Sequence, residues 1–366
     1  MGFLTAPEDA LIEAVAAGQT QLRLNHCFGS LDAVFKNALQ KEPRLLAFLA
    51  GYSSTYQKKG LVQLCFDYDV TLCYQEPRPA SLGEVAVDTG VWDPAPLLRR
   101  GLPREETLVT QDPADVSRKL SALLGRLLSE YEGIHGWRTR VSSFGKLSPY
   151  AVCTVSYDYL LPLPQLRQLQ GKARFAAKQI WRSILGRAAV PRFVKPFLAL
   201  SYLSQECGYD QRAFDEAAGA SDAEPSDPIP HLAYGPLVEK RGICSGLAWA
   251  FKTLMDEANI ECRCVSGALK DAPETGHQWN LVRLDGQLYH VDPTWGIREE
   301  GVFVGGLLQP DSMMRGTHLW NAGDYPAARG MHFGYDLIES YLAENGNEFL
   351  DAGADERIFF PDRIVE

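Results

Sequence analysis

The sequence lacks several features that would place it in a common class of protein. No stretch approaches the roughly 18 consecutive apolar residues of a membrane-spanning helix. The phosphate-binding motif GxxxxGK[ST] is absent, and the scattered glycines form no dinucleotide-binding pattern between a strand and a helix. The first residues, MGFLTAPEDALIEAV, have no basic segment followed by an apolar run. We therefore expect no secretory signal and a cytoplasmic protein.

The chain also has no excess of positive charge. It carries 36 Lys and Arg against 46 Asp and Glu, which gives a formal net charge of −10. This balance argues against nucleic acid or an anionic membrane surface as the main partner. A peptide or protein substrate is compatible with the charge, and the sequence does not indicate an oligomeric state.

The chain is too long for one ordinary hydrophobic core. With 366 residues, two domains are the default expectation, and contents of 46% hydrophobic and 22% charged residues are typical of a globular protein. Several of the eight cysteines lie inside apolar runs such as LVQLCFDYDV and AVCTVSYDYL. We therefore expect reduced, buried thiols rather than disulfides.

Residues 1–165 predict an N-terminal α/β domain. Ser30 is a suitable N-cap for a helix whose apolar residues recur at helical spacing. Expected helices cover residues 7–18, 30–43 and 113–130, and expected strands cover residues 20–25, 44–57, 61–74, 135–144 and 148–161. A turn is expected at residues 58–60, and the stretch 76–111, rich in Pro and Gly, predicts a surface loop.

The order helix–strand–strand occurs twice in this region. The sequence Tyr68-Asp69-Val70 in the first copy resembles Tyr157-Asp158-Tyr159 in the second. This similarity indicates a degenerate duplication of residues 1–75 and 112–165. The alternative is two unrelated strands of similar composition.

Residues 166–366 predict a second domain, with the boundary near Gln165. The pattern becomes helical over residues 172–188 and 192–208. The acidic, Pro-containing stretch 219–230 predicts a loop between these helices and the most informative part of the chain.

A helix is predicted to begin at or just after Cys244. Apolar residues follow with the 3.6-residue period of a buried helix, at Leu247, Phe251, Leu254, Met255 and Ala258. A thiol at a helix start faces unpaired backbone N–H groups and the positive end of the helix dipole. Both favour a thiolate, and the N–H groups can stabilise an oxyanion. Gly242 and Gly246 leave room for the close approach of backbone or substrate.

A β-hairpin is predicted around Asp285-Gly286. The segments HQWNLVRL and QLYHVDPTW flank this dipeptide, which is a strong signal for a two-residue turn. With such a turn, Leu284 opposes Gln287, and continuing both strands places His277 opposite Thr294. Strand parity then puts the alternate residues of both strands on one face of the sheet.

The same register places Trp279 opposite Asp292 and makes His277 and Asp292 diagonal neighbours. Such neighbours lie about 7–8 Å apart at the backbone, so the carboxylate can reach the imidazole. A carboxylate there orients the imidazole and stabilises its charged form. We therefore predict that Cys244, His277 and Asp292 form a thiol catalytic triad.

Three motifs in this block resemble those of the bacterial transglutaminase-like, papain-related superfamily. They are GICSGLA at residues 242–248, HQWN at 277–280 and YHVDPTW at 289–295. The preceding HLAYGPLV at 231–238 and the trailing HLW at 318–320 are also similar to the family. The resemblance implies a Cys–His–Asp triad that acts on amide bonds, as a transferase, protease or deamidase.

Several other residues are candidates for roles at this site. Tyr234, Trp279, Trp295 and His318 are candidate substrate contacts, and structural packing is the alternative for these side chains. His290 lies on the predicted face beside Asp292 and is an alternative to His277.

A zinc site formed by Cys244, Cys262, Cys264 and His277 is a further alternative. The Cys-x-Cys pair on the predicted strand 261–267 directs both thiols to one face. However, zinc ligand pairs are usually separated by two to four residues, and the sequence contains no second pair. We therefore expect neither a metal ion nor an organic cofactor.

The sequence thus predicts an α+β protein whose C-terminal domain is a papain-like transglutaminase core, in which a helix carrying the nucleophile packs on an antiparallel sheet. The expected activity is thiol-dependent acyl transfer or hydrolysis at amide bonds of peptide or protein substrates. The triad is common to hydrolases and transferases, so both remain open. A non-catalytic binding or scaffold module that retains the fold is the alternative from another class.

Overall fold

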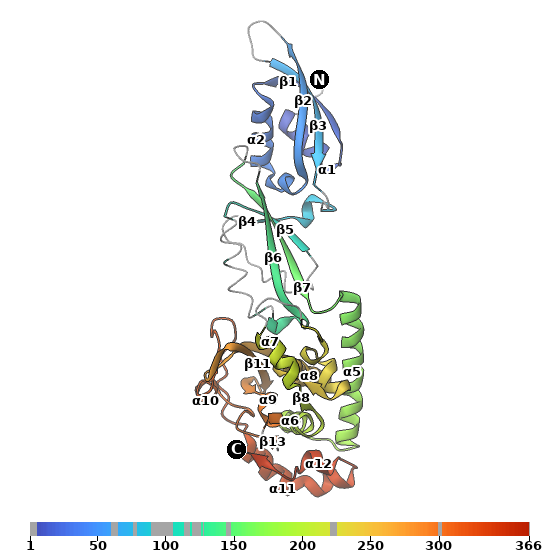
Figure 1. Cartoon of the computed structure of the whole chain (residues 1–366), viewed down its shortest axis with the longest axis vertical. Coiled ribbons are helices and arrows are strands. Elements are labelled where there is room, and N and C mark those ends of the chain that lie inside the picture. The colour runs from blue at the N-terminus through green and yellow to red at the C-terminus, as the bar shows by residue number, and fades with distance from the viewer. Residues whose placement is uncertain are drawn as a thin grey trace. The chain divides into compact units, whose positions relative to one another are not determined.

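The computed structural model describes residues 6–59, 65–75, 79–88, 105–112, 118, 126, 128–143, 148–219, 225–298 and 302–365 (Figure 1). The chain divides into two compact units, Met1–Ala122 with Gly136–Asp158, and Leu123–His135 with Tyr159–Glu366. The second unit therefore includes a segment that the predicted limits of 1–165 and 166–366 assign to the N-terminal region. Within the described residues, no helix combines the length and apolar character that crossing a membrane requires.

The first unit contains two sheets. A three-stranded sheet has the order β1-β3-β2, and a four-stranded sheet has the order β4-β5-β7-β6. The elements are α1 (Pro7–Ala16), β1 (Gln21–Phe28), α2 (Leu31–Lys41), the 3₁₀ turn η1 (Pro43–Ala47), β2 (Leu49–Lys59), β3 (Cys65–Tyr74), the 3₁₀ turn η2 (Leu82–Glu84), β4 (Ala86–Asp88), β5 (Glu105–Thr110), β6 (Ile134–Ser143) and β7 (Ala151–Tyr159).

Local signals explain most of the elements around the first sheet. The Ser30 hydroxyl accepts a hydrogen bond from the Ala33 N–H, as the predicted N-cap of α2 requires. The buried face of α2 packs on the sheet, where the Phe35 ring stacks on Tyr52 with centroids 3.8 Å apart. The predicted strand 44–57 is wrong at its start, because Pro43 opens a 3₁₀ turn that the Glu42 carboxylate caps.

The second sheet corrects the prediction that residues 76–111 form a loop. β4 and β5 lie within that stretch, and β5 pairs antiparallel with β7. Of the predicted helix 113–130, the structure describes residues 118, 126 and 128–130, and the rest lies outside the described residues, as does Gly60 of the predicted turn. β7 lies between β5 and β6 just as β3 lies between β1 and β2, and the duplication remains a prediction.

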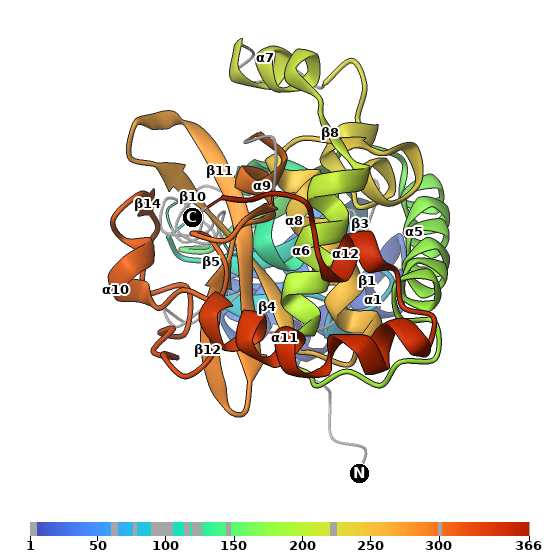
Figure 2. The same ribbon diagram turned by 90° about the horizontal axis from the view of Figure 1, so that it is seen from below.

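The second unit contains a four-stranded sheet of order β12-β11-β10-β14 with helices packed beside it (Figure 2). Its elements are α5 (Leu163–Leu185), α6 (Lys195–Glu206), β8 (Gly208–Tyr209), α7 (Gln211–Gly219), the turns η4 (Ile229–His231) and η5 (Gly235–Glu239), β9 (Arg241–Gly242), α8 (Cys244–Glu257), β10 (Cys262–Leu269), β11 (Ala272–Leu284), β12 (Gln287–Val291), α9 (Pro293–Arg298), β13 (Val302–Phe303), α10 (Asp311–Met314), β14 (His318–Leu319), α11 (Tyr335–Asp351), α12 (Glu356–Phe359) and β15 (Ile364–Val365). The predicted mixed α+β class is therefore confirmed.

Helix α8 lies at the centre of this unit and contacts β11, α5, α6 and α9. The stripe predicted from the sequence is its buried face, and it belongs to the largest hydrophobic cluster of the unit. The Trp181 indole N–H donates to the Leu254 carbonyl over 2.8 Å and fastens α5 to α8. A helix surrounded in this way has little freedom to shift, so its first residue is held in a defined place.

The predicted hairpin is confirmed in its register. Leu284 pairs with Gln287 and Asn280 with Val291, and Asp285 and Gly286 both have positive φ, as a type I′ turn requires. The prediction is wrong at the end of the second strand, because β12 ends at Val291 and α9 begins at Pro293. A proline is favoured at the first position of a helix and cannot donate to a strand ladder, which explains the change.

Candidate active site

Cys244 is the first residue of α8, where the sequence places it. The Ile243 N–H before it donates to the Pro230 carbonyl over 3.0 Å. A Cβ on Gly246 would overlap that same carbonyl oxygen, and a Cβ on Gly242 would lie 2.6 Å from the Pro236 ring. The two glycines of the cysteine motif are therefore required because the preceding segment packs directly against the start of α8.

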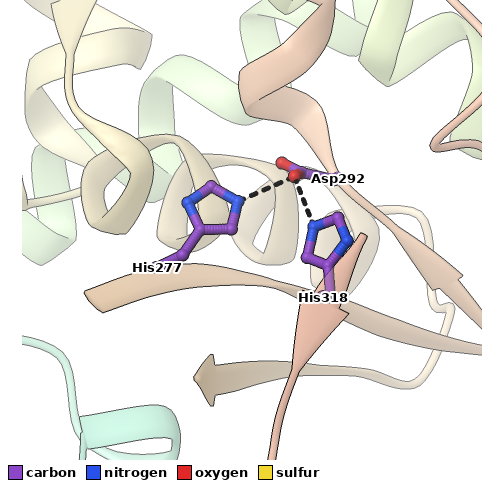
Figure 3. Close-up of side chains that lie close together, drawn as sticks. All are labelled: His277, Asp292 and His318. Carbon is purple, nitrogen blue, oxygen red and sulfur yellow. Dashed lines mark hydrogen bonds and ion pairs between the residues drawn. The ribbon is translucent and has the colours of Figure 1, made fainter. Parts of the chain in front are cut away.

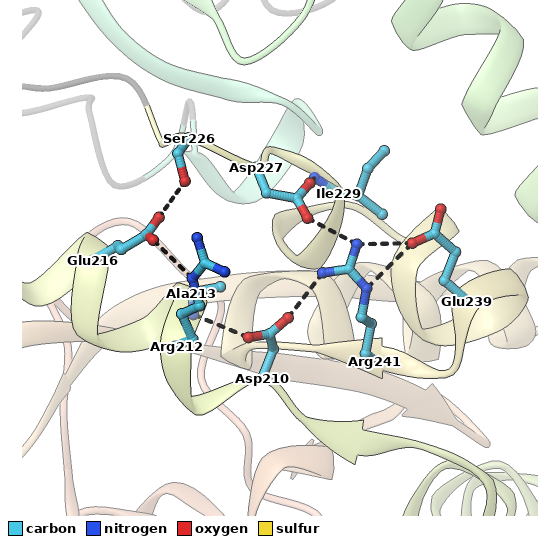
Figure 4. Close-up of polar contacts among 9 residues, drawn as sticks. All are labelled: Asp210, Arg212, Ala213, Glu216, Ser226, Asp227, Ile229, Glu239 and Arg241. Atoms are coloured by element: carbon cyan, nitrogen blue, oxygen red, sulfur yellow. Dashed lines mark hydrogen bonds and ion pairs between the residues drawn. The ribbon is translucent and has the colours of Figure 1, made fainter.

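Arg241 fixes this approach to α8 (Figure 4). Its guanidinium donates to Asp210 over 2.9 Å and to Asp227 and Glu239 over 2.8 Å each. Its hydrogen bonds to Asp227 first, then to Asp210 and Glu239, raise the pKa of the guanidinium. Because Arg241 lies on β9 three residues before Cys244, this network joins three separate segments at the base of α8.

Two residues of the HQWN motif lie on β11 and interact with residues of α8. His277 is near the beginning of the strand pairing with β10, opposite Gly267. Asn280 is fully buried, and its amide donates to the Ala248 carbonyl of α8 over 2.9 Å. That hydrogen bond sets the spacing between the helix that carries Cys244 and the strand that carries His277.

Asp292 lies between β12 and α9 and binds His277 (Figure 3). The distance from His277 Nε2 to Asp292 Oδ2 is 2.7 Å. The other carboxylate oxygen accepts from the Thr294 N–H over 2.9 Å, and the Asp292 N–H donates to the Gly306 carbonyl. The start of α9 that follows Asp292 therefore fixes its carboxylate. The pairing of β11 with β12 ends at Asn280 and Val291, so the predicted pairing of Trp279 with Asp292 does not form.

The exposure of the three predicted triad residues is graded. Asp292 is 0% exposed, whereas Cys244 and His277 keep 9% and 8% of their surface. Of these three residues, Cys244 and His277 therefore keep a little exposed surface, whereas Asp292 keeps none.

The electrostatics of the His277–Asp292 pair favour its ionised form. Burial disfavours an imidazolium, but the charge and hydrogen bond of Asp292 outweigh it and raise the pKa of His277, with a further contribution from Cys244. Burial likewise disfavours a carboxylate, but the charge and hydrogen bond of His277 lower the pKa of Asp292. Since Asp292 occupies Nε2, the nitrogen that remains for the Cys244 thiol is Nδ1.

His318 is a second histidine on the same carboxylate oxygen. Its Nε2 lies 3.1 Å from Asp292 Oδ2, and its Nδ1 lies 2.8 Å from the Thr317 hydroxyl. The residue is 1% exposed, so a substrate contact by this side chain is not supported. The contact between His318 and Asp292 depends on the pairing of β14 with β10. That pairing joins two residues of each strand, which is too short to leave a strand pattern in the sequence.

Trp279 on β11 and His290 on β12 are joined to each other beside His277 and His318. Trp279 is fully buried, and its indole N–H donates to His290 Nδ1 over 2.9 Å. His290 Nε2 lies 2.8 Å from the Asp311 carboxylate. Burial lowers the pKa of His290 to about 4 despite Asp311. Both ring nitrogens of His290 are therefore engaged away from Cys244, and Trp279 leaves no surface for a substrate.

Trp295 and Tyr234 differ from the other two candidate contacts in being partly exposed. Trp295 borders a cavity of about 500 Å³ whose other lining residues are Leu269, Lys270, Asp271, Phe303, Gly316 and Thr317. Tyr234 packs against the core at the start of η5, with the Lys172 ammonium 5.9 Å from its ring centroid. Trp295 is the candidate whose surroundings offer space for a ligand.

His277, Asp292 and His318 are close enough together for a metal ion to be considered, with ligand atoms within 4.8 Å of one another. Two ligands on one tetrahedral zinc ion, each at about 2.0–2.2 Å, would lie roughly 3.3–3.6 Å apart. The observed distances of 2.7 and 3.1 Å are those of direct hydrogen bonds. Cys262 and Cys264 lie in the hydrophobic core, where burial raises the pKa of both thiols.

Comparison with known proteins gives a family match over part of the chain. Residues 196–293 match the model of the transglutaminase-like superfamily, an interval that contains Cys244, His277 and Asp292. No curated protein matches the sequence. Among solved structures, the chain is similar to a TGase with 11% identity and a TM-score of 0.29, covering 58% of this chain and 59% of that one. It is also similar to a proposed cysteine protease from Cytophaga hutchinsonii, with 14% identity and a TM-score of 0.27, covering 54% and 75%.

Proposed function

Because residues 196–293 form a core of the transglutaminase-like superfamily, we propose that the protein is a thiol-dependent enzyme acting on amide bonds of peptide or protein substrates. The proposed triad is Cys244, His277 and Asp292. The observation that carries the proposal is the hydrogen-bonded His277–Asp292 pair, with Cys244 interacting with the imidazole from the start of α8.

The proposed reaction has two steps. The Cys244 sulfur attacks the amide carbonyl, and the first N–H groups of α8, which have no partner within the helix, stabilise the oxyanion. His277 donates its proton to the leaving amine as the C–N bond breaks, which leaves a thioester. Water or a second amine then attacks the thioester, gives a proton to His277 and releases the acyl group from Cys244.

The acceptor in the second step separates a protease or deamidase from a transferase. All of these reactions use the same nucleophile and the same imidazole, so the triad supports each equally. The cavity beside Trp295 is the proposed place for the part of the substrate that extends from the reacting amide, because Trp295 follows Asp292 by three residues.

A non-catalytic binding module is the second candidate. The observation that favours it is the low exposure of Cys244 and His277, because a substrate carbonyl must reach the thiol of a residue that is 9% exposed. A scaffold with this fold would keep the core but would not need a reactive thiol.

A thiol-directed alkylating probe with mass-spectrometric localisation separates these two candidates. An enzyme should show one hyper-reactive site at Cys244, faster than the exposed Cys73 of the same chain, which serves as an internal reference. Activity is then measured on a peptide library with and without a primary amine. Cys244→Ala should lower turnover by about 10³-fold or more, and Cys73→Ala should leave it unchanged. Equal turnover by wild type and Cys244→Ala would exclude the proposed triad.

A further inference from the structure

The Asp292 carboxylate has two histidines on one oxygen atom. His277 and His318 both direct Nε2 at Oδ2, over 2.7 and 3.1 Å, while the Thr294 N–H binds Oδ1 (Figure 3). The three donors arrive from β11, β14 and the first turn of α9. A buried carboxylate that is bound from three directions cannot rotate without losing at least one of these bonds.

Several contacts hold His318 where it can serve Asp292. Leu269 and Ala268 on β10 pair with β14, and this pairing is close because Gly267 has no Cβ to meet the Leu319 carbonyl. The rings of Trp279 and Trp295 lie 4.8 and 4.9 Å from the His318 ring, centroid to centroid. The imidazole is therefore enclosed by aromatic groups and meets polar atoms at its two nitrogens.

The partner of Nδ1 determines which nitrogen of His318 carries the proton. The Thr317 hydroxyl lies 2.8 Å from Nδ1 and 3.4 Å from the Met314 carbonyl. The shorter contact favours donation of the hydroxyl proton to Nδ1, so that the proton of a neutral His318 is on Nε2 and is donated to Asp292. Thr317 thus sets the tautomer of His318 as a carboxylate sets that of a catalytic histidine.

We propose that His318 is a positioning residue of the site, which orients Asp292 toward His277 by donating a hydrogen bond from Nε2. This inference rests on the proposed function, since it concerns the third member of the proposed triad. The hydrogen bond also makes Oδ2 a weaker proton acceptor, so the proton of the imidazolium stays on His277. His318 therefore acts through Asp292 and touches neither the substrate nor the reacting atoms.

Two substitutions of His318 distinguish a hydrogen bond from packing. His318→Gln keeps an N–H donor of similar reach, whereas His318→Leu fills an aromatic pocket with an apolar side chain. Positioning predicts that the Leu variant lowers the rate of Cys244 alkylation at pH 6 by about 10-fold or more. The Gln variant should recover most of that loss. A packing role predicts the reverse order, with Leu better tolerated than Gln, and that order would overturn the proposal.

The measurement uses the full chain and requires no substrate. Alkylation by iodoacetamide is followed at Cys244 and at Cys73, and the nitrogen resonances of isotope-labelled histidines report the protonation and hydrogen bonding of His277. Thr317→Val, which removes the hydroxyl proton that sets the tautomer, should lower the alkylation rate in the same direction as His318→Leu. It also provides a test if the Leu variant does not fold. An unchanged Cys244 rate and unchanged His277 resonances in Thr317→Val and His318→Leu would contradict the inference.

The outcome also separates this inference from the proposed function. A wild-type Cys244 that reacts no faster than Cys73 contradicts the proposed function itself. A fast wild-type Cys244 that is indifferent to both substitutions contradicts the role of His318 alone.

Discussion

Asp292 illustrates how a single residue can serve the chain in two ways. Its carboxylate binds His277 with one oxygen and begins α9 with the other. The sequence Asp-Pro-Thr is both the end of a family motif and the start of a helix. The strand predicted through Trp295 is wrong because Asp-Pro-Thr is also a signal for the start of a helix.

The reactivity of Cys244 should persist to lower pH than that of Cys73. The raised pKa of His277 keeps the imidazole charged through neutral pH, and the imidazolium stabilises a thiolate beside it. Asp292→Asn removes the charge that supports the imidazolium, so the alkylation profile should move to higher pH, and His277→Ala should move it further. The check is the alkylation rate of Cys244 against pH in wild type and both variants. Superimposable profiles in wild type and His277→Ala would show that the pair does not form.

Asn280 should be costly to replace although it touches no substrate. Asn280→Ala removes the buried hydrogen bond to Ala248 and leaves a small cavity between α8 and β11, so we expect a loss of about 2–3 kcal/mol in the free energy of unfolding. Urea unfolding measures this loss, and Cys244 alkylation should slow because its distance to His277 is no longer fixed. Asn347→Ala on the exposed face of α11 is the control and should change neither quantity. A fully stable Asn280→Ala would show that the hydrogen bond does not hold helix and strand together.

At the scale of elements, α8 and the segment before it pack together as one unit. The Pro230 carbonyl oxygen accepts a hydrogen bond from the Ile243 N–H and lies where a Cβ of Gly246 would be. The chain can therefore take this path only because residue 246 has no side chain. The three acidic partners of Arg241 then fix the ends of that path. The sequence predicted a close approach of backbone or substrate at Gly242 and Gly246. In the structure, the Pro236 ring approaches Gly242 and the Pro230 backbone approaches Gly246.

Gly246→Ala should displace the start of α8. The added methyl group overlaps a backbone oxygen that cannot move without breaking the bond to Ile243, so we expect a loss of about 1–3 kcal/mol and a slower reaction of Cys244. Gly171→Ala in α5 is the matched control, since a Cβ there meets nothing within 4 Å. The control should be neutral or stabilising by about 0.5–1 kcal/mol. Thermal unfolding and alkylation of both variants check the prediction; equal behaviour of the two would refute the close approach.

At the scale of the whole molecule, the second unit draws on a segment far from its other residues in sequence. The Gln278 amide donates to the Leu128 carbonyl over 2.9 Å, and the Ala233 N–H donates to Glu132 over 2.7 Å. The first contact lies beside the proposed site, because Gln278 follows His277 directly. Leu123–His135 thus belong to the second unit although they precede the predicted boundary near Gln165, and no pattern in their sequence indicates it.

The stability of the molecule should depend on pH through the His277–Asp292 pair. The lowered pKa of Asp292 contributes stability that is present above its unfolded value of about 3.9 and is lost as pH falls through the folded value. The raised pKa of His277 contributes stability that is present below about 6.5 and is lost as pH rises through the folded value. The difference in unfolding free energy between wild type and Asp292→Asn should therefore be largest between about pH 4 and 6.5.

Urea unfolding of the two proteins across this range is the measurement. Asp69→Asn, which breaks an exposed ion pair with Arg23, is the control and should show little difference at any pH. A difference between wild type and Asp292→Asn that does not vary with pH would contradict the shifted pKa values.

The sequence by itself determined the local parts of the site. The apolar stripe after Cys244 requires a buried helix, and Asp285-Gly286 with alternating flanks requires a hairpin in one register. These two facts place a thiol at a helix start and bring His277 and Asp292 together, because periodicity and turn geometry act over a few residues. The family resemblance rests on the same residues and agrees with the match over residues 196–293.

Only the tertiary structure decided which groups lie behind the proposed triad. The pairing of β14 with β10, the hydrogen bond of His318 to Asp292 and the place of residues 123–135 depend on contacts between segments distant in sequence. Such contacts are selected by packing and by the need to satisfy buried polar groups, and neither leaves a periodic pattern in the chain. Gly267 is an example of what the sequence does not indicate. Its sequence context is ordinary, and a glycine is needed there because the Leu319 carbonyl lies where a side chain would be.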